Sequence, residues 1–414
     1  MEQLELMSAD ALTTLEKNFF NSRQTQSSTS QELSDEAINM KYLKGEIRIV
    51  TEQARYPLAS INEVFKKSSY DFMPDFQRRH RWDRKQQSKL IESFIMNVPI
   101  PPIFLYEKEY STYEVMDGLQ RLTAIIEFYN DQYELEGLEQ WGELNGKKYS
   151  QLPEQVKKGI DRRYLSSIVL LKETAKTEKE ANLMKQMVFS RINSGGAKLE
   201  DQEYRNSLYP GAFNNMLIEL ARNSYFCDIF GIPPKTVDED LANDVISDEL
   251  RENPLFSKMK DAEIVLRFFA MRNIHAWGSG TLTRFLDQIC SDGQKLPEEM
   301  IEAYKKMFEQ TIQLAYEIYE ENVFRMRKKI PVDGGEPKWR WNNSPNIVVY
   351  DPVMVALSHY IDKREQLLAK RYVIKIQTQR LFEENETMWN GRNTSSSYVI
   401  ERILAFENIF QAVL

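Results

Sequence analysis

The chain has 414 residues, of which 42% are hydrophobic and 28% are charged, and its formal net charge is −8 at pH 7. One hydrophobic core rarely serves a chain of this length, so the length predicts two or more domains. The negative charge argues against a protein that wraps nucleic acid over its whole surface, but it leaves room for a local basic face.

The distribution of residue types excludes other broad classes of protein. No apolar run approaches the ~20 residues that a membrane-spanning helix needs, so no membrane partner is expected. The two cysteines, Cys227 and Cys290, are too few for a disulfide framework and lack the spacing of zinc ligands. Acidic residues come before any basic residue at the start of the chain, which is unlike a secretory signal. We therefore expect a cytoplasmic location.

Residues 1–42 are predicted to be a leader that is partly helical and partly polar. Apolar side chains recur at helical spacing in residues 1–20, at Leu4, Met7, Leu12 and Leu15. This pattern predicts a short helix that docks either on a partner or on the body of the protein. Residues 21–36 are polar and low in complexity, which is typical of a linker.

Residues 43–203 are predicted to form a mixed α/β domain. A helix near 84–96 should end before Pro99, because proline cannot continue a helix and favours extended geometry in its predecessor. Strands are expected at 103–106, around 113–115 and at 167–172. After Asp117-Gly118 a further helix begins, and its apolar positions follow the helical period at Leu122, Ile125, Ile126 and Tyr129.

The junction at residues 117–121 carries the strongest chemical signal. Unpaired amides and the dipole at a helix start favour an anion, typically a phosphate. Asp117, Gln120 and Arg121 are three and four residues apart, so they share one helical face and can hold a nucleotide with its metal ion. Arg121 and the amides after Gly118 would bind phosphates, and Asp117 would ligate Mg²⁺ or orient a water. The alternative is that Asp117 only caps the helix and Arg121 is a surface residue.

Residues 204–414 are predicted to form a mostly α-helical domain that becomes basic toward the C-terminus. Helical periodicity is clearest at 301–319. Glycines at 334–335 with nearby prolines predict a loop. From Arg325 onward cations outnumber carboxylates and tryptophans are interleaved, as a surface that contacts duplex DNA would require. The candidate DNA-binding residues are Arg325, Lys328, Lys329, Lys338 and Arg340, and the alternative is an ordinary solvated surface.

Several short motifs follow one another in a recognisable order. They are Pro-Asp-Phe-Gln-Arg at 74–78, Leu-Ile-Glu-Ser at 90–93 with Pro-Ile-Pro at 99–101, Asp-Gly-Leu-Gln-Arg at 117–121, and Ile-Asn-Ser-Gly-Gly at 192–196. Together they resemble the N-terminal domain of the GmrSD-type restriction endonucleases, within the ParB/sulfiredoxin-like superfamily, over roughly residues 55–290. The sequence departs from the family pattern at Leu119, where the family usually has a glutamine.

The resemblance implies an α+β protein, in which a ParB/sulfiredoxin-like mixed α/β domain precedes a mostly α-helical domain. It also implies binding and hydrolysis of a nucleoside triphosphate with Mg²⁺, with Asp117, Gln120 and Arg121 as catalytic residues. Neighbouring segments would contribute further nucleotide contacts, through Gln77, Arg78, Gly118, Asn193, Gly195 and Gly196. Such a chain would be a sensor subunit of a prokaryotic anti-phage or restriction system that engages DNA.

The effector of such a system would be a separate protein. Multi-domain relatives carry a C-terminal His-Asn-His nuclease, whose active site needs closely spaced histidines. Residues 291–414 contain a single histidine, His359, so a partner would supply the cutting activity. Two other functions stay open on the sequence alone. The chain could be a metal-dependent DNA nuclease itself, or a non-catalytic protein-interaction module that uses nucleotide as a switch.

Overall fold

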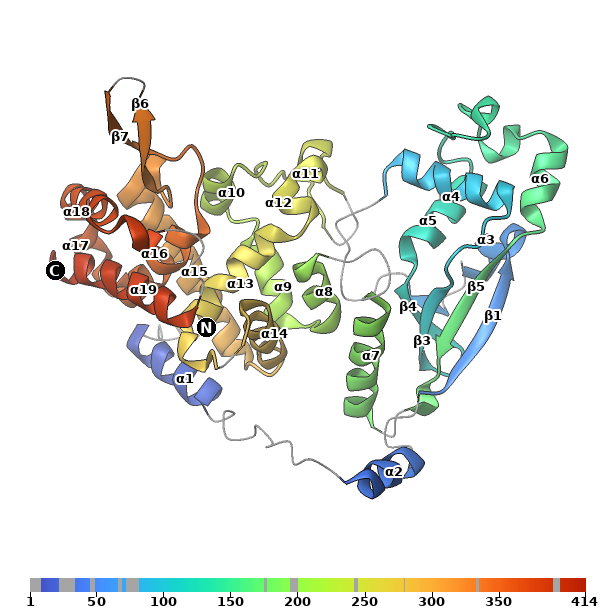
Figure 1. The fold of residues 1–414 in the computed structure, drawn as a ribbon, viewed down its shortest axis with the longest axis horizontal. Coiled ribbons are helices and arrows are strands. Elements are labelled where there is room, and N and C mark those ends of the chain that lie inside the picture. Colours follow the sequence, from blue (N-terminus) through green and yellow to red (C-terminus); the bar gives the residue numbers. More distant parts are fainter. Residues whose placement is uncertain are drawn as a thin grey trace, which may run out of the picture. The chain divides into compact units, whose positions relative to one another are not determined.

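The computed structural model describes residues 9–21, 34–44, 49–65, 69–71, 82–174, 177–193, 200–241, 245–278, 280–332, 335–389 and 395–414. It divides into two compact units (Figure 1). We call Ser30–Leu199 the sheet unit, and Met1–Thr29 together with Glu200–Leu414 the helical unit. The predicted α+β class is confirmed, because one unit contains a mixed sheet and the other is mostly helical. In the part of the chain that the structure describes, no helix is long and apolar enough to cross a membrane.

The sheet unit is built on five strands in the order β1-β5-β3-β4-β2. The central strands β3 and β5 are parallel, β4 runs antiparallel to β3, and β1 runs antiparallel to β5. The predicted strands at 103–106, 113–115 and 167–172 are confirmed at least in part by β3, β4 and β5. The strand bounds are β1 (Thr51–Pro57), β2 (Tyr70–Asp71), β3 (Ile103–Glu109), β4 (Thr112–Asp117) and β5 (Tyr164–Leu170).

Helices cover the sheet and supply most of its hydrophobic core. The predicted helix at 84–96 is confirmed as α4, which begins with a capping box between Asp83 and Gln86 and ends at Asn97 in the left-handed region. Apolar residues of α3, α4, α5 and α6 form one core with Leu105 and Val115 of the sheet. The described helices of this unit are α2 (Asp35–Lys44), α3 (Ile61–Phe65), α4 (Arg84–Met96), α5 (Leu119–Tyr129), α6 (Glu154–Asp161) and α7 (Glu178–Asn193).

Helix α7 covers the opposite face of the sheet at β4. Successive side chains of a strand alternate between faces, so Glu114 points away from the core that contains Val115. The Glu114 carboxylate is 3% exposed and pairs with Lys185 of α7, whose Nζ lies 2.5 Å from Oε1. This buried ion pair attaches α7 to the strand that leads directly into the junction at 117–121.

Glu92, within the Leu-Ile-Glu-Ser motif, holds a neighbouring loop through backbone hydrogen bonds. Its side chain lies on α4 and the residue is 4% exposed. Oε1 accepts from the amides of Gln140 at 2.7 Å and Trp141 at 2.9 Å, and Oε2 accepts from Glu139 at 3.3 Å. A motif residue therefore has a structural role here, because it satisfies three backbone donors of a loop without a regular ladder.

Replacing Glu92 by alanine is expected to lower the free energy of unfolding by about 1–3 kcal/mol, because three backbone amides of the loop lose their acceptor. Glu92→Gln is the matched control, since its amide oxygen can still accept from Gln140 and Trp141. Urea titrations of both variants measure the difference. Equal stability of Glu92→Ala and wild type would contradict this account of the loop.

The helical unit packs around a large aromatic core that includes Phe268, Phe269, Tyr304, Phe308 and Tyr350. The helix predicted at 301–319 is confirmed within α15. The described helices are α1 (Ala9–Asn21), α8 (Asp201–Leu208), α9 (Ala212–Leu220), α10 (Ser224–Phe230), α11 (Asp248–Glu252), α12 (Pro254–Ser257), α13 (Lys260–Arg272), α14 (Leu282–Gly293), α15 (Glu298–Tyr319), α16 (Ile347–His359), α17 (Arg364–Ala369), α18 (Arg371–Glu384) and α19 (Ser396–Gln411).

A β-hairpin interrupts this helical unit where the sequence predicted a loop. Strands β6 (Arg327–Val332) and β7 (Gly335–Trp341) pair in antiparallel fashion, so the prediction of a loop around 334–335 was wrong for most of that stretch. Proline usually interrupts regular structure, but a two-stranded ribbon has two free edges, where a missing N–H is tolerated. Figure 1 shows the hairpin projecting from the helices of its unit.

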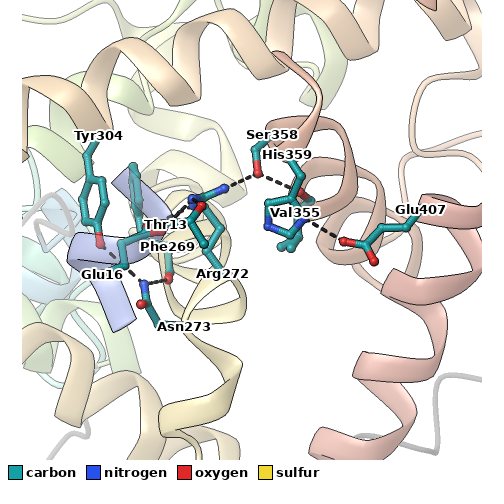
Figure 2. Close-up of polar contacts among 10 residues, drawn as sticks. All are labelled: Thr13, Glu16, Phe269, Arg272, Asn273, Tyr304, Val355, Ser358, His359 and Glu407. Atoms are coloured by element: carbon teal, nitrogen blue, oxygen red, sulfur yellow. Dashed lines mark hydrogen bonds and ion pairs between the residues drawn. The ribbon is translucent and has the colours of Figure 1, made fainter. Parts of the chain in front are cut away.

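Helix α1 belongs to the helical unit, although more than 200 residues separate it from its partners. Leu12 and Phe20 lie in the core of that unit. Glu16 and Arg272 form a buried ion pair, with 2.6 Å between Oε2 and Nη2 and 3.0 Å between Oε1 and Nε (Figure 2). The predicted N-terminal helix is thus present, and it docks on the body of the same chain.

Further polar groups complete the contact between α1 and the helical unit (Figure 2). Arg272 also donates to Thr13 at 3.2 Å and to the Ser358 hydroxyl. Nearby, Asn273 donates to the Tyr304 hydroxyl at 3.4 Å. Burial, together with the Glu16 carboxylate, raises the pKa of Tyr304 well above its ordinary value. The Arg272 guanidinium is therefore surrounded by acceptors and is not a lone buried charge.

Candidate functional site

The change from strand β4 to helix α5 takes place at Gly118. This residue is at the N-cap of α5 with φ of 91°, a left-handed conformation that favours glycine. A Cβ atom added there would lie 2.4 Å from Cγ2 of Ile103 on the neighbouring strand. Both the backbone conformation and the close approach of β3 therefore require glycine at this turn.

Asp117 and Arg121 form an ion pair across this turn. Nη2 of Arg121 donates to Oδ2 of Asp117 at 2.6 Å, and the two side chains are 13% and 21% exposed. Nη1 of Arg121 donates to the Pro101 carbonyl at 2.6 Å and to the Pro102 carbonyl at 3.3 Å. Arg121 thus connects the end of β4, the start of α5 and the proline-rich segment before β3.

Asp117 and Arg121 are in contact, but Asp117 is the last residue of β4 and not part of α5, and Gln120 contacts another segment. Gln120 Oε1 accepts a hydrogen bond from the amide of Trp82 at 3.1 Å, so the amide side chain fixes the segment that precedes α4. No side chain caps α5 among the described residues, because its N-cap is Gly118. The sequence alternative, in which Asp117 only caps the helix and Arg121 is a free surface residue, does not describe this arrangement.

The remaining predicted nucleotide contacts are placed less completely. Asn193 is the last residue of α7. Gln77, Arg78, Gly195 and Gly196 lie outside the described residues, so their approach to the junction stays a prediction. Within the described part of the chain, no group of three or more His, Cys, Asp or Glu residues is placed to hold a metal ion.

Sequence reasoning missed the residues that hold Arg121 in place. No pattern in the sequence indicates a contact between Arg121 and Pro101 or Pro102, yet the carbonyl groups of both prolines accept from its guanidinium. Trp82 contacts the neighbouring Gln120 in the same way, through its backbone amide. Backbone groups of this kind carry no residue-type signal, so no sequence pattern could have identified them.

The register of the β6–β7 hairpin separates the candidate DNA-binding residues. Lys328 pairs with Arg340, Lys329 with Trp339, and Ile330 with Lys338. Directly opposed residues share a face and successive residues alternate. We therefore call Lys328, Ile330, Lys338 and Arg340 the outer face, and Arg327, Lys329, Trp339 and Trp341 the inner face.

Three of the five predicted DNA-binding residues lie together on the outer face. Lys328, Lys338 and Arg340 are exposed, and none forms an ion pair with a described residue. Lys329 lies on the inner face, with its Nζ 5.7 Å from the centroid of the Trp339 ring. Arg325 precedes β6 and lines a small cavity with Trp341 and Phe324. The five basic residues, which are close in sequence, therefore lie in three different places: on the outer face, on the inner face and at the cavity.

A known protein family matches the segment that contains the junction at 117–121. Residues 61–210 match the family described as the GmrSD restriction endonuclease N-terminal domain. The match includes α4, β3, β4 and α5, and hence the Asp117–Arg121 pair. Comparison with curated proteins and comparison with solved structures each gave no match. This match confirms the predicted resemblance of residues 61–210 to the GmrSD restriction endonuclease N-terminal domain.

Proposed function

We propose that this chain is a nucleoside-triphosphate-binding and hydrolysing component of a prokaryotic restriction or anti-phage system. The observation that carries the proposal is the Asp117–Arg121 pair at a strand–glycine–helix turn, inside the segment that matches a restriction endonuclease domain. A helix start of this kind presents backbone N–H groups and a positive dipole end to an anion. A cation held beside it adds to the attraction for phosphate.

Arg121 is suited to contact phosphate while it stays in place. A guanidinium has five N–H donors, and the hydrogen bonds to Asp117, Pro101 and Pro102 use three of them. The other two N–H groups of the guanidinium would be free to donate to phosphate. Because the side chain is already held in one conformation, phosphate binding would cost less conformational entropy. Gly118 lets the first amides of α5 approach the same anion. Gln120 would act as a positioning residue through Trp82.

Asp117 is the residue that would hold Mg²⁺ or orient its water. Its side chain is 21% exposed, and Mg²⁺ is commonly bound by one or two carboxylates together with phosphate oxygens and waters. When bound, the ion would neutralise the negative charge that builds on the phosphates. Gln77, Arg78, Asn193, Gly195 and Gly196 complete the proposed nucleotide site. The base of the nucleotide is left to experiment.

We also propose that the chain engages duplex DNA and that a protein partner supplies the nuclease. His359 is the one histidine in residues 291–414, and its Nδ1 lies 2.7 Å from Oε1 of Glu407, between α16 and α19. This contact between helices supports a structural role for His359. The proposal therefore places recognition and nucleotide turnover on this chain and cleavage on another.

Replacing Arg121 by alanine is expected to reduce nucleotide turnover at least ~100-fold, the size of effect seen when one well-placed donor to a developing charge is removed. Asp117→Asn should have an effect of the same order if the carboxylate holds Mg²⁺. Arg162→Ala is the matched control, because Arg162 is an exposed arginine of the same unit. Phosphate release from each of the four ribonucleoside triphosphates with Mg²⁺, with and without duplex DNA, measures the effect.

Binding and stability measurements separate chemistry from structure in these variants. Arg121 also supports the segment at Pro101, so each variant is compared with wild type by thermal unfolding. Arg121→Lys keeps the charge but loses the fork geometry, and it should recover little turnover. Turnover by Arg121→Ala equal to that of Arg162→Ala would refute the site. Binding without turnover would favour the nucleotide-switched module, and metal-dependent DNA cleavage by the purified chain would favour the nuclease alternative.

A further inference from the structure

We infer that the outer face of the β6–β7 hairpin binds duplex DNA as a two-stranded ribbon, with Lys328, Lys338 and Arg340 against the phosphates. The inference rests on the proposed function, because it assigns the DNA contact of that function to a defined surface. Of the five candidate DNA-binding residues, the inference leaves out Lys329 and Arg325, which would not contact DNA directly.

The inner face anchors the hairpin on the helical unit. Nη1 of Arg327 lies 2.5 Å from Oε1 of Glu383 on α18, and its guanidinium carbon lies 5.7 Å from the centroid of the Trp341 ring. The ring of Trp341 meets Phe382 of α18 edge to face, with centroids 6.0 Å apart. These contacts fix the base of the ribbon and leave the other face turned to solvent.

The outer face concentrates positive charge in an arrangement that is unfavourable without a counter-charge. Lys328 lies directly opposite Arg340, and like charges directly opposed in a sheet are destabilising. Lys338 is two residues from Arg340, about 6.8 Å along the strand. Residues 327–341 contain five cations against two acidic residues, Asp333 and Glu336, both close in sequence to the junction of β6 and β7. A polyanion that lies along the ribbon would relieve this repulsion, so the surface has the chemistry of a binding site for dense negative charge.

Duplex DNA fits this surface better than an acidic protein does. DNA carries one negative charge per ~1.7 Å of helix axis, a density that a folded protein surface does not offer. Its major groove, about 12 Å wide, admits a two-stranded β-ribbon. Ile330 is 42% exposed and lies opposite Lys338 on the outer face. An apolar side chain among the cations can meet the thymine methyl groups and sugars that line a groove.

The test compares charge reversals on the two faces of the same ribbon. Fluorescence anisotropy with a labelled 20-base-pair duplex, titrated at several salt concentrations, reports both the affinity and its salt slope. The triple variant Lys328→Glu, Lys338→Glu, Arg340→Glu is expected to lose at least ~100-fold in affinity at low salt. Loss of three phosphate contacts should also reduce the slope of log K against log salt by about 2 to 3.

Two matched controls define what the loss means. Lys329→Glu changes the same charge one residue away on the inner face, and it should weaken binding less than Lys328→Glu does. Reversal of three exposed lysines elsewhere in the helical unit, Lys260, Lys295 and Lys306, changes the net charge by the same amount. This second control should leave the salt slope as in wild type. Thermal unfolding of every variant checks whether charge reversal disturbs the fold. If it does, the three outer-face cations are replaced by glutamine instead.

The outcomes separate this inference from the proposed nucleotide chemistry. Equal affinity of the outer-face variant and the charge-matched control would overturn the inference. So would a wild type that fails to bind duplex DNA at low salt with and without nucleotide. Outer-face variants should keep the DNA-independent turnover of wild type. Duplex binding that needs the outer face in a protein without turnover would support the inference while refuting the proposed hydrolysis.

Discussion

Replacing Arg272 by methionine is expected to lower the free energy of unfolding of the helical unit by about 3–5 kcal/mol. Methionine keeps much of the length of the side chain but leaves the Glu16 carboxylate, whose side chain is 2% exposed, without its partner. A buried, unpaired charge is far less favourable than either the pair or an apolar replacement of both residues. Helix α1 should detach at lower denaturant concentration than in wild type.

Denaturant titrations with Arg364→Met as the matched control measure this effect. Arg364 also pairs with a glutamate, Glu317, but these side chains are 33% and 27% exposed. Its loss should therefore cost about 1 kcal/mol or less. The double variant Glu16→Ala, Arg272→Met removes both charges and should be more stable than Arg272→Met alone. Equal stability of Arg272→Met and Arg364→Met would show that the buried pair does not hold α1.

Replacing Gly118 by alanine is expected to destabilise the sheet unit by about 2–5 kcal/mol and to abolish nucleotide turnover. The left-handed φ of 91° costs an L-residue about 1–2 kcal/mol. Crowding against Cγ2 of Ile103, which the new Cβ would approach to 2.4 Å, adds about 1–3 kcal/mol. Relief of that contact must displace either β3 or the start of α5, and with it the Asp117–Arg121 pair.

Gly146→Ala isolates the steric part of this effect. Gly146 also has a positive φ, of 79°, but a Cβ there would meet nothing within 4 Å. It should therefore cost only the backbone contribution of about 1–2 kcal/mol. Thermal unfolding of the two variants, followed by phosphate release, gives the comparison. Gly118→Ala with the stability and turnover of Gly146→Ala would mean that the turn tolerates a side chain.

Local patterns in the sequence were enough to predict the main elements of both units. A one-sided apolar stripe at Leu90, Ile91, Phe94 and Ile95 and the following Pro99 predict the helix at 84–96, and it forms as α4. The strand–glycine–helix junction was read from a β-rich run, Asp117-Gly118 and a helical period. These signals are local, because hydrophobic periodicity and turn residues act over a few positions. The same locality underlies the contact between Asp117 and Arg121, which are four residues apart.

Only the tertiary structure decided what these residues contact. Glu16 and Arg272 are 256 positions apart, and the Pro101 carbonyl that holds Arg121 belongs to another segment. The hairpin pairing, which the prolines and glycines concealed, separates Lys328 from its neighbour Lys329. Contacts of this kind depend on how distant segments pack and in which register strands pair, so they leave no pattern among neighbouring residues. The sequence by itself therefore determined the elements and the chemistry of the junction, and packing determined its geometry and the outer face.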